Sequence, residues 1–253
     1  MILSHDDAQA PTVLEDGRLA LATRRGLAYE QAGKANQDRV ATNGVADLVA
    51  DGLGGYEDGA KAAQLLAENL QSDPEETLRK TLVSYEKQQL QSPAGTTFLH
   101  AVRKGSLLRV SHIGDSRALL YHQDGTLLWQ SQDDKPASFE HRFKLTRYVH
   151  LMPEQQLLSQ LTIDEIDLSS YDQPQVLILA SDGITDNLKT SLEDQDCTAL
   201  IGSIIQRYQD SEAICSRLME QANQRMALSG SPEGHRFDVK PDNSSCLVRI
   251  ILP

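Results

Sequence analysis

The sequence predicts an α+β protein built on antiparallel β-sheets. Between residues 95 and 131, short apolar segments follow one another and are separated only by "RKG", "GDS" and "DG". Short links of this kind join antiparallel neighbours, whereas parallel strands need a crossover of a dozen or more residues. Pairs of helix-like segments interrupt the strands after residue 58 and after residue 190. Strands interrupted by helix pairs indicate an α+β architecture.

The first part of the chain alternates between strand and helix patterns. Residues 19–29 are typical of an early strand, and residues 39–50 of a hairpin with an Asn-Gly turn. Residues 59–71 carry alanine and leucine at helical spacing. A second helix is expected at 74–91, because its opening proline is tolerated in a first helical turn.

The rest of the chain continues the pattern. We expect an antiparallel meander of four strands, and a mixture of loop and helix over residues 133–170. An apolar strand, two helices and a final strand complete the chain. The meander strands are 95–102, 106–113, 117–123 and 126–131, and the later elements are 175–180, 191–208, 211–228 and 244–252.

The length, charge and apolar content of the chain exclude some classes of protein. The chain has 253 residues and no linker rich in Pro, Gly or Ser, so a single domain, 1–253, is expected. Its 24 basic and 36 acidic residues give a net charge of 24 − 36 = −12, which repels nucleic acids and anionic membranes. No apolar run approaches the ~20 residues of a membrane helix. Acids stand where a signal peptide would be basic, so a cytoplasmic location is expected.

The three cysteines predict neither a disulfide framework nor a zinc cluster. The chain has an odd number of cysteines without paired spacing, namely Cys197, Cys215 and Cys246. Cysteine is often buried as a small apolar residue. We therefore expect these thiols to be core or surface residues in a reducing compartment.

Four aspartates stand at the ends of expected strands. Asp51 and Asp182 each follow an apolar strand and precede a glycine, whereas Asp38 and Asp242 come just before strands. Each alone is typical of an ordinary turn. Four aspartates at the ends of strands, however, predict a site at which the edge of a sheet brings their carboxylates together.

The chemistry of such a site favours a hard cation. Carboxylate oxygens, water and a backbone carbonyl are suitable ligands for Mg²⁺ or Mn²⁺, and without a cation the like charges would repel. A neighbouring glycine lets a carbonyl approach the ion. The phosphate-binding GxxxxGK[ST] loop, the EF-hand loop, HExxH and GxSxG are absent from the sequence.

A series of motifs along the chain resembles the metal-dependent type 2C Ser/Thr protein phosphatases, particularly the compact bacterial members. Each motif is weak alone, but together they follow the family's order. They are "NQD" at 36–38, "DGLGG" at 51–55, "GTT" at 95–97, "GDSR" at 114–117, "SQDDKP" at 131–136, "LTR" at 145–147, "SDGITD" at 181–186 and "DN" at 242–243.

The resemblance implies a sandwich of two antiparallel sheets flanked by helix pairs, with two Mn²⁺ or Mg²⁺ ions in a cleft. Asp51 would bridge both ions, and Asp51 and Asp38 would be the catalytic carboxylates. Asp182 and Asp242 would complete the first site. The carbonyl of Gly52, with Asp38, would hold the second ion.

Further expectations follow from the same resemblance. Asp133 would help to bind a third, weaker ion. Water activated between the two ions would hydrolyse phosphoserine or phosphothreonine in proteins, without a covalent intermediate. The implied partners are phosphoprotein substrates and a Ser/Thr kinase that phosphorylates them. Asp115 and Asp186 are expected to have structural roles, as a turn residue and as a cap or outer-shell residue.

The chain departs from the family at the position that usually carries a phosphate-binding arginine. That position is Gly33, and the adjacent Lys34 is the candidate substitute, although lysine offers a point charge instead of a planar fork. Arg24 and Arg25 are less well placed. Two alternatives therefore remain beside the phosphatase: a catalytically weak phosphatase-like domain that binds a phosphoprotein or regulator, and a non-catalytic metal-binding interaction module.

Overall fold

The computed structural model describes two compact units, and each is considered by itself. The first unit consists of Met1–Ser4, Gln37–Ser116 and Ser131–Ser169, and the second of His5–Asn36, Arg117–Gln130 and Ser170–Pro253. The chain therefore passes between the units several times, and the single domain 1–253 stays a prediction. The described residues are 3–4, 10–53, 58–90, 94–135, 145–189, 196–229, 231 and 239–253.

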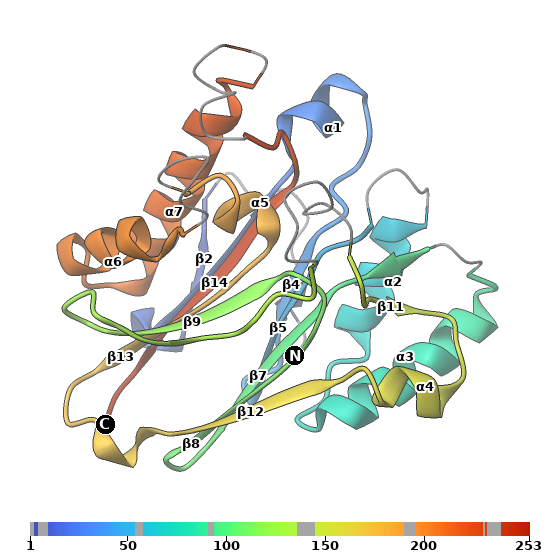
Figure 1. Ribbon diagram of the computed structural model, residues 1–253, viewed down its shortest axis with the longest axis horizontal. Coiled ribbons are helices and arrows are strands. Elements are labelled where there is room, and N and C mark those ends of the chain that lie inside the picture. The colour runs from blue at the N-terminus through green and yellow to red at the C-terminus, as the bar shows by residue number, and fades with distance from the viewer. Residues whose placement is uncertain are drawn as a thin grey trace. The chain divides into compact units, whose positions relative to one another are not determined.

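A six-stranded antiparallel sheet forms the centre of the first unit (Figure 1). Helices α2 and α3 pack against each other, and apolar side chains such as Leu48, Leu66 and Phe98 fill the core between helices and sheet. The strands, in sheet order, are β1 (Leu3–Ser4), β4 (Arg39–Thr42), β5 (Ala46–Ala50), β7 (Phe98–Lys104), β8 (Leu107–Ile113) and β12 (Thr162–Asp167). The other elements are α2 (Gly59–Glu68), α3 (Pro74–Lys87), α4 (Glu154–Leu158) and the small strand pair β6 (Gly95–Thr96) and β11 (Val149–His150).

The helix pair of this unit forms where the sequence predicts it. The side chain of Asp73 caps α3 by accepting a hydrogen bond from the N–H of Glu75 at 2.9 Å, and Pro74 occupies the first turn. The apolar stripe of α2 includes Ala62, Leu65 and Leu66, which are all buried. Periodicity, cap and proline agree, so both helices are confirmed.

The second unit has its own six-stranded antiparallel sheet. Helix α7 packs on β14 and β3, and α6 packs on α7. The strands, in sheet order, are β10 (Leu127–Gln130), β9 (Arg117–His122), β13 (Gln175–Ala180), β14 (Ser244–Ile251), β3 (Leu19–Arg24) and β2 (Thr12–Leu14). The helices are α1 (Leu27–Gln31), α5 (Asp182–Thr185), α6 (Thr198–Arg207) and α7 (Ser211–Met226), and a short 3-10 turn lies at Glu15–Gly17. A further 3-10 turn, Leu168–Ser170, stands where the chain passes from the first unit to the second.

The α+β class with antiparallel sheets is confirmed, but the four-strand meander is wrong. β7 pairs with β8 in one sheet, whereas β9 pairs with β10 in the other. The three-residue link 114–116 therefore connects strands of two different sheets and closes no hairpin. Gly114 has a positive φ of 112°, and its N–H donates to Asp134 Oδ2 at 2.8 Å instead of to a neighbouring strand.

Three smaller expectations also need correction. The early strand ends at Arg24, and helix α1 replaces its predicted second half. The region 133–170 contains the strand β12 in addition to loop and helix. The helix expected at 191–208 begins at Thr198, and residues 191–195 lie outside the described part. All three cysteines are buried and none forms a disulfide, which agrees with a place in the core.

None of the described helices has the length and apolar character required to cross a membrane.

Candidate metal centre

The backbone of Asp51 is fixed by the "GTT" segment. Asp51 follows β5 and is half-buried. Its N–H donates to Thr97 Oγ1 at 2.9 Å, and its carbonyl accepts from the Thr97 N–H at 2.8 Å and from Thr96 Oγ1 at 2.9 Å. Three hydrogen bonds therefore hold the residue that is expected to bridge two ions, and they explain why the motif needs threonines.

Gly52 lies where no side chain fits. A Cβ at this position would lie 2.5 Å from the carbonyl oxygen of Gly59 and 2.7 Å from that of Gln37. Its own N–H donates to the Gln37 carbonyl at 3.2 Å. The glycine thus allows three backbone segments to meet beside Asp51, as the motif predicts, whereas the later glycines of "DGLGG", at 54 and 55, lie outside the described residues.

Asp38 is a fully buried carboxylate at the start of β4. Its exposed fraction is 0%. The neighbouring Arg39 donates from Nη1 to the Asp38 carbonyl at 2.7 Å and from Nε to Gln64 Oε1 at 2.6 Å. A buried carboxylate is expensive in free energy unless a cation or donors compensate its charge, so its position suits a metal ligand.

The two aspartates of "SQDDKP" have different environments. Asp133 is half-buried. Asp134 is buried and structural, because it contacts the backbone of Gly114 and forms an ion pair with Arg147 of the "LTR" motif. Asp115 pairs with Lys135 Nζ at 2.7 Å, which agrees with the structural role expected for it.

In the second unit, Gly183 and Gly26 allow the segment 241–243 to approach closely. A Cβ on Gly183 would lie 1.7 Å from the carbonyl oxygen of Asn243, and one on Gly26 would lie 2.0 Å from that of Asp242. The Gly26 N–H donates to Asn243 Oδ1 at 3.1 Å. The glycine of "SDG" and the asparagine of "DN" therefore bring the segment that carries Asp242 to the start of α5, where Asp182 lies.

Asp182 and Asp242 repel each other, and the first is buried while the second is half-buried. Burial, followed by the negative charge of Asp182, raises the pKa of Asp242 to about 6. Asp182 is 6% exposed. Two neighbouring carboxylates, one buried and one half-buried, are a suitable donor set for a hard divalent cation, so the residues present fit the expected metal.

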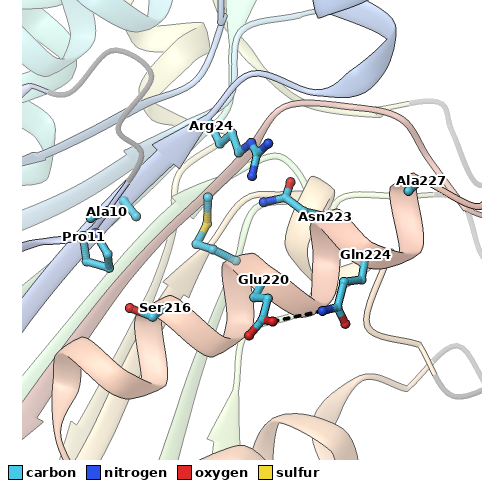
Figure 2. Close-up of a pocket in the computed structure, with 10 residues that line it drawn as sticks. Ala10, Pro11, Arg24, Ser216, Glu220, Asn223, Gln224 and Ala227 are labelled. Carbon is cyan, nitrogen blue, oxygen red and sulfur yellow. Dashed lines mark hydrogen bonds between the residues drawn. The ribbon is translucent and has the colours of Figure 1, made fainter.

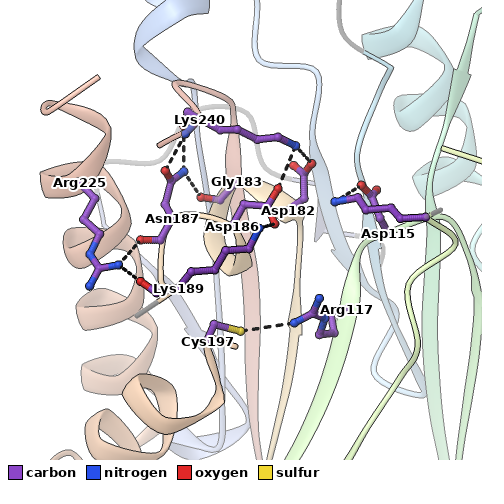
Figure 3. A network of polar contacts seen from close by, with 11 residues as sticks. Asp115, Arg117, Asp182, Gly183, Asp186, Asn187, Lys189, Cys197, Arg225 and Lys240 are labelled. Atoms are coloured by element: carbon purple, nitrogen blue, oxygen red, sulfur yellow. Dashed lines mark hydrogen bonds and ion pairs between the residues drawn. The ribbon is translucent and has the colours of Figure 1, made fainter. Parts of the chain in front are cut away.

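Two lysines form ion pairs with Asp182 and Asp186 in a network that the motifs do not predict (Figure 3). Lys240 Nζ forms ion pairs with Asp182 Oδ2 and, at 3.0 Å, with Asp186 Oδ2. Lys189 Nζ pairs with the other oxygen of Asp186 at 2.9 Å. Asp186 thus holds two ammonium groups, and the cap or outer-shell role expected for it stays a prediction.

The structure explains the glycine at the position of the missing arginine. Gly33 has a φ of 65° and ends α1: its N–H donates to the Glu30 carbonyl at 3.1 Å, and that of Lys34 donates to the Tyr29 carbonyl at 2.9 Å. This is a Schellman helix end, which requires a left-handed residue. Lys34 is exposed, and no described side chain forms an ion pair with it.

The predicted ligands divide between the two units. Asp182 and Asp242 belong to the second, and the first unit contains Asp38, Asp51, Gly52 and Asp133. Within the described part of the chain, no three His, Cys, Asp or Glu side chains meet in a geometry that would hold a metal ion. Convergence of the carboxylates from both units on the ions therefore stays a prediction.

A cavity lies beside α7, and none of the predicted ligands lines it (Figure 2). Its volume is about 550 Å³, and its walls include Pro11, Ala22 and Met219. Both Arg24 and Glu220 line it, so its charge favours no one class of ligand.

Solved structures of bacterial phosphatases share the fold. PppA, a key regulatory component of T6SS in Pseudomonas aeruginosa, is 18% identical, with a TM-score of 0.68 over 92% of this chain and 97% of its own. PstP/Ppp of Mycobacterium tuberculosis, a serine/threonine phosphatase, is 25% identical, with a TM-score of 0.63 over 93% of this chain and 98% of its own. A catalytic domain of PstP has been solved in complex with two manganese ions.

Comparisons of the sequence also match the chain to protein phosphatases. Protein phosphatase 1L of Bos taurus is 30% identical over 145 residues, which are 48% of this chain and 39% of the relative. The chain thus spans about two fifths of that relative's length. The family Protein phosphatase 2C matches residues 25–225, which is most of the chain. The resemblance seen in the motifs is therefore confirmed, and the chain belongs to the protein phosphatase 2C family.

Proposed function

We propose that the chain is a protein serine/threonine phosphatase that hydrolyses phosphoserine and phosphothreonine at a dinuclear Mn²⁺ or Mg²⁺ centre. Membership of the family supports the reaction class. The observation that carries the proposal is the pair of the buried Asp182 and the half-buried Asp242, whose mutual repulsion suits a bound cation. A protein that only needed a stable fold would gain little from such a pair.

Each carboxylate has a proposed task. Asp182, Asp242 and Asp51 would hold the first ion, and Asp51 with Asp38 and the Gly52 carbonyl would hold the second. Asp133 would help to hold a third, weaker ion. When bound, the ions neutralise phosphate oxygens and supply an activated water. The aspartates position the ions and the substrate and form no covalent bond with phosphorus, so no phosphoenzyme is expected.

Lys34 is the proposed contact to the substrate phosphate. It is exposed and follows the left-handed Gly33, which turns the chain directly after α1. The backbone of Lys34 is fixed because its carbonyl accepts from Arg25 Nη1 at 3.3 Å. Phosphoprotein substrates with a partner kinase, a cytoplasmic location and a bacterial signalling role stay predictions.

The experiment is hydrolysis of p-nitrophenyl phosphate and of a phosphothreonine peptide with Mn²⁺, Mg²⁺, Ca²⁺ or EDTA. We expect turnover with Mn²⁺ or Mg²⁺ and none with EDTA. Peptide binding without turnover would favour the weak phosphatase-like domain instead. Turnover that is unchanged in EDTA would contradict the metal centre.

A further inference from the structure

We propose that Lys240 is an internal counter-ion of Asp182, and that a divalent cation must displace its ammonium group to bind. The inference rests on the proposed metal centre. It adds a residue that sets the affinity of that centre for its ion.

The geometry places the ammonium group on a predicted metal ligand. Lys240 Nζ contacts Asp182 Oδ2 and lies 3.0 Å from Asp186 Oδ2 (Figure 3). The Lys240 side chain is 19% exposed, and the two aspartate side chains are 8% and 5% exposed. Charge-assisted contacts with so little access to water are stronger and less screened than surface ion pairs.

The backbone of Lys240 is held in place for this contact. Its N–H donates to Asn187 Oδ1 at 3.0 Å, and its carbonyl accepts from Asn187 Nδ2 at 2.9 Å. Asn187 Nδ2 also donates to the carbonyl of Gly183, the residue after Asp182. One amide side chain therefore ties the lysine to the helix that carries the aspartate, so the ion pair is part of the local fold.

The contact competes with metal binding. A cation bound to the Asp182 carboxylate would lie close to the ammonium group, and the repulsion between the two positive charges favours displacement of Lys240. The charge of Lys240 also acts on Asp242, where it opposes the rise in pKa. The Lys240 ammonium group can move away from Asp182, because a lysine side chain is flexible and Asp186 is a second carboxylate with which it can pair.

Lys189 provides the matched comparison. It forms an ion pair with Asp186 and with no other described carboxylate. Lys240→Met and Lys189→Met each remove one positive charge from Asp186, but only Lys240→Met releases Asp182. A difference between the two variants therefore reports on the contact with Asp182 and not on overall charge.

The test is calorimetric titration of the metal-free protein with Mn²⁺ at fixed pH and salt. We expect Lys240→Met to bind Mn²⁺ about ten-fold more tightly, because one charge-assisted contact no longer has to be broken. Lys189→Met should stay within about two-fold of the wild type. In EDTA, Lys240→Met should unfold at a lower temperature than the wild type, and saturating Mn²⁺ should remove the difference.

Any other outcome contradicts the proposed role of Lys240. Unchanged or weaker Mn²⁺ binding in Lys240→Met would overturn it while leaving the proposed function intact. An equal gain in Lys189→Met would assign the effect to overall charge and would also overturn it. A wild type that binds no Mn²⁺ would overturn both proposals. If Lys240→Met does not fold, Lys240→Gln provides the same comparison with a polar side chain of lower volume.

Discussion

Replacing Gly183 by alanine tests how the fold brings Asp182 and Asp242 together. The added Cβ would lie 1.7 Å from the Asn243 carbonyl oxygen, whereas ordinary contacts begin near 3.4 Å. One segment must therefore move by 3.4 − 1.7 = 1.7 Å. Overpacking of this kind typically costs about 1–3 kcal/mol. For a chain of this size, a loss of ~2 kcal/mol corresponds to a decrease in unfolding temperature of about 4–8 °C.

The displacement should also weaken metal binding. Moving the backbone of Asn243 moves Asp242, the adjacent residue, away from Asp182. We expect Mn²⁺ affinity to fall at least about ten-fold, which corresponds to ~1.4 kcal/mol. Thermal unfolding in EDTA measures the first effect, and calorimetric titration with Mn²⁺ measures the second.

Gly202→Ala is the matched control. Its Cβ would lie 2.4 Å from the Gly125 carbonyl oxygen, in the same unit but among residues that are not predicted ligands. It should lower the unfolding temperature and leave Mn²⁺ affinity unchanged. The reasoning is refuted if Gly183→Ala keeps the wild-type unfolding temperature and affinity, or if Gly202→Ala weakens Mn²⁺ binding equally.

Three further predictions concern Gly33, Lys34 and His100. Gly33→Arg should lower the free energy of unfolding by about 1 kcal/mol, because the φ of 65° at this position is unfavourable for a residue with a Cβ. Gly33→Asn should lower it less. If urea unfolding shows that Gly33→Arg is as stable as the wild type, this prediction is contradicted. Lys34→Ala should raise KM for a phosphothreonine peptide and leave Mn²⁺ affinity unchanged; steady-state kinetics with an unchanged KM would remove Lys34 from the site. Burial lowers the pKa of His100 from its ordinary value of 6.5. Just below pH 6.5, His100 is therefore protonated in the unfolded chain and not in the folded one, so the free energy of unfolding falls as the pH decreases. Urea unfolding at pH 7 and pH 5 should therefore show a smaller loss in His100→Gln than in the wild type, and equal losses would exclude the histidine.

Local patterns predicted the parts of the fold in which neighbours in sequence are neighbours in space. Helix α3 follows from a cap, a proline and apolar periodicity within a single stretch. The sequence does not predict β12, because burial alternates along this strand but apolar character does not follow it: Ile163 is exposed while Asp164 is half-buried.

Other features depend on contacts between distant residues. The link 114–116 resembles a hairpin turn, but Asp134 holds it through Gly114 and the chain continues into a different sheet. Lys240 carries no motif signal, because its partner Asp182 is 58 positions away and Asn187 fixes its backbone. The motif aspartates could be named from the sequence, whereas the lysines that neutralise them could not.

The most direct test of the central claim is Mn²⁺ binding and hydrolysis in Asp51→Ala. Asp51 is the residue proposed to bridge both ions, and its anchoring hydrogen bonds are made by its backbone, so the fold should survive the change. With circular dichroism confirming the fold, we expect the wild type to bind two Mn²⁺ per chain and to hydrolyse a phosphothreonine peptide. Asp51→Ala should lose Mn²⁺-stimulated hydrolysis and at least one bound ion. A folded Asp51→Ala protein that binds two Mn²⁺ and retains wild-type turnover would contradict the proposed centre.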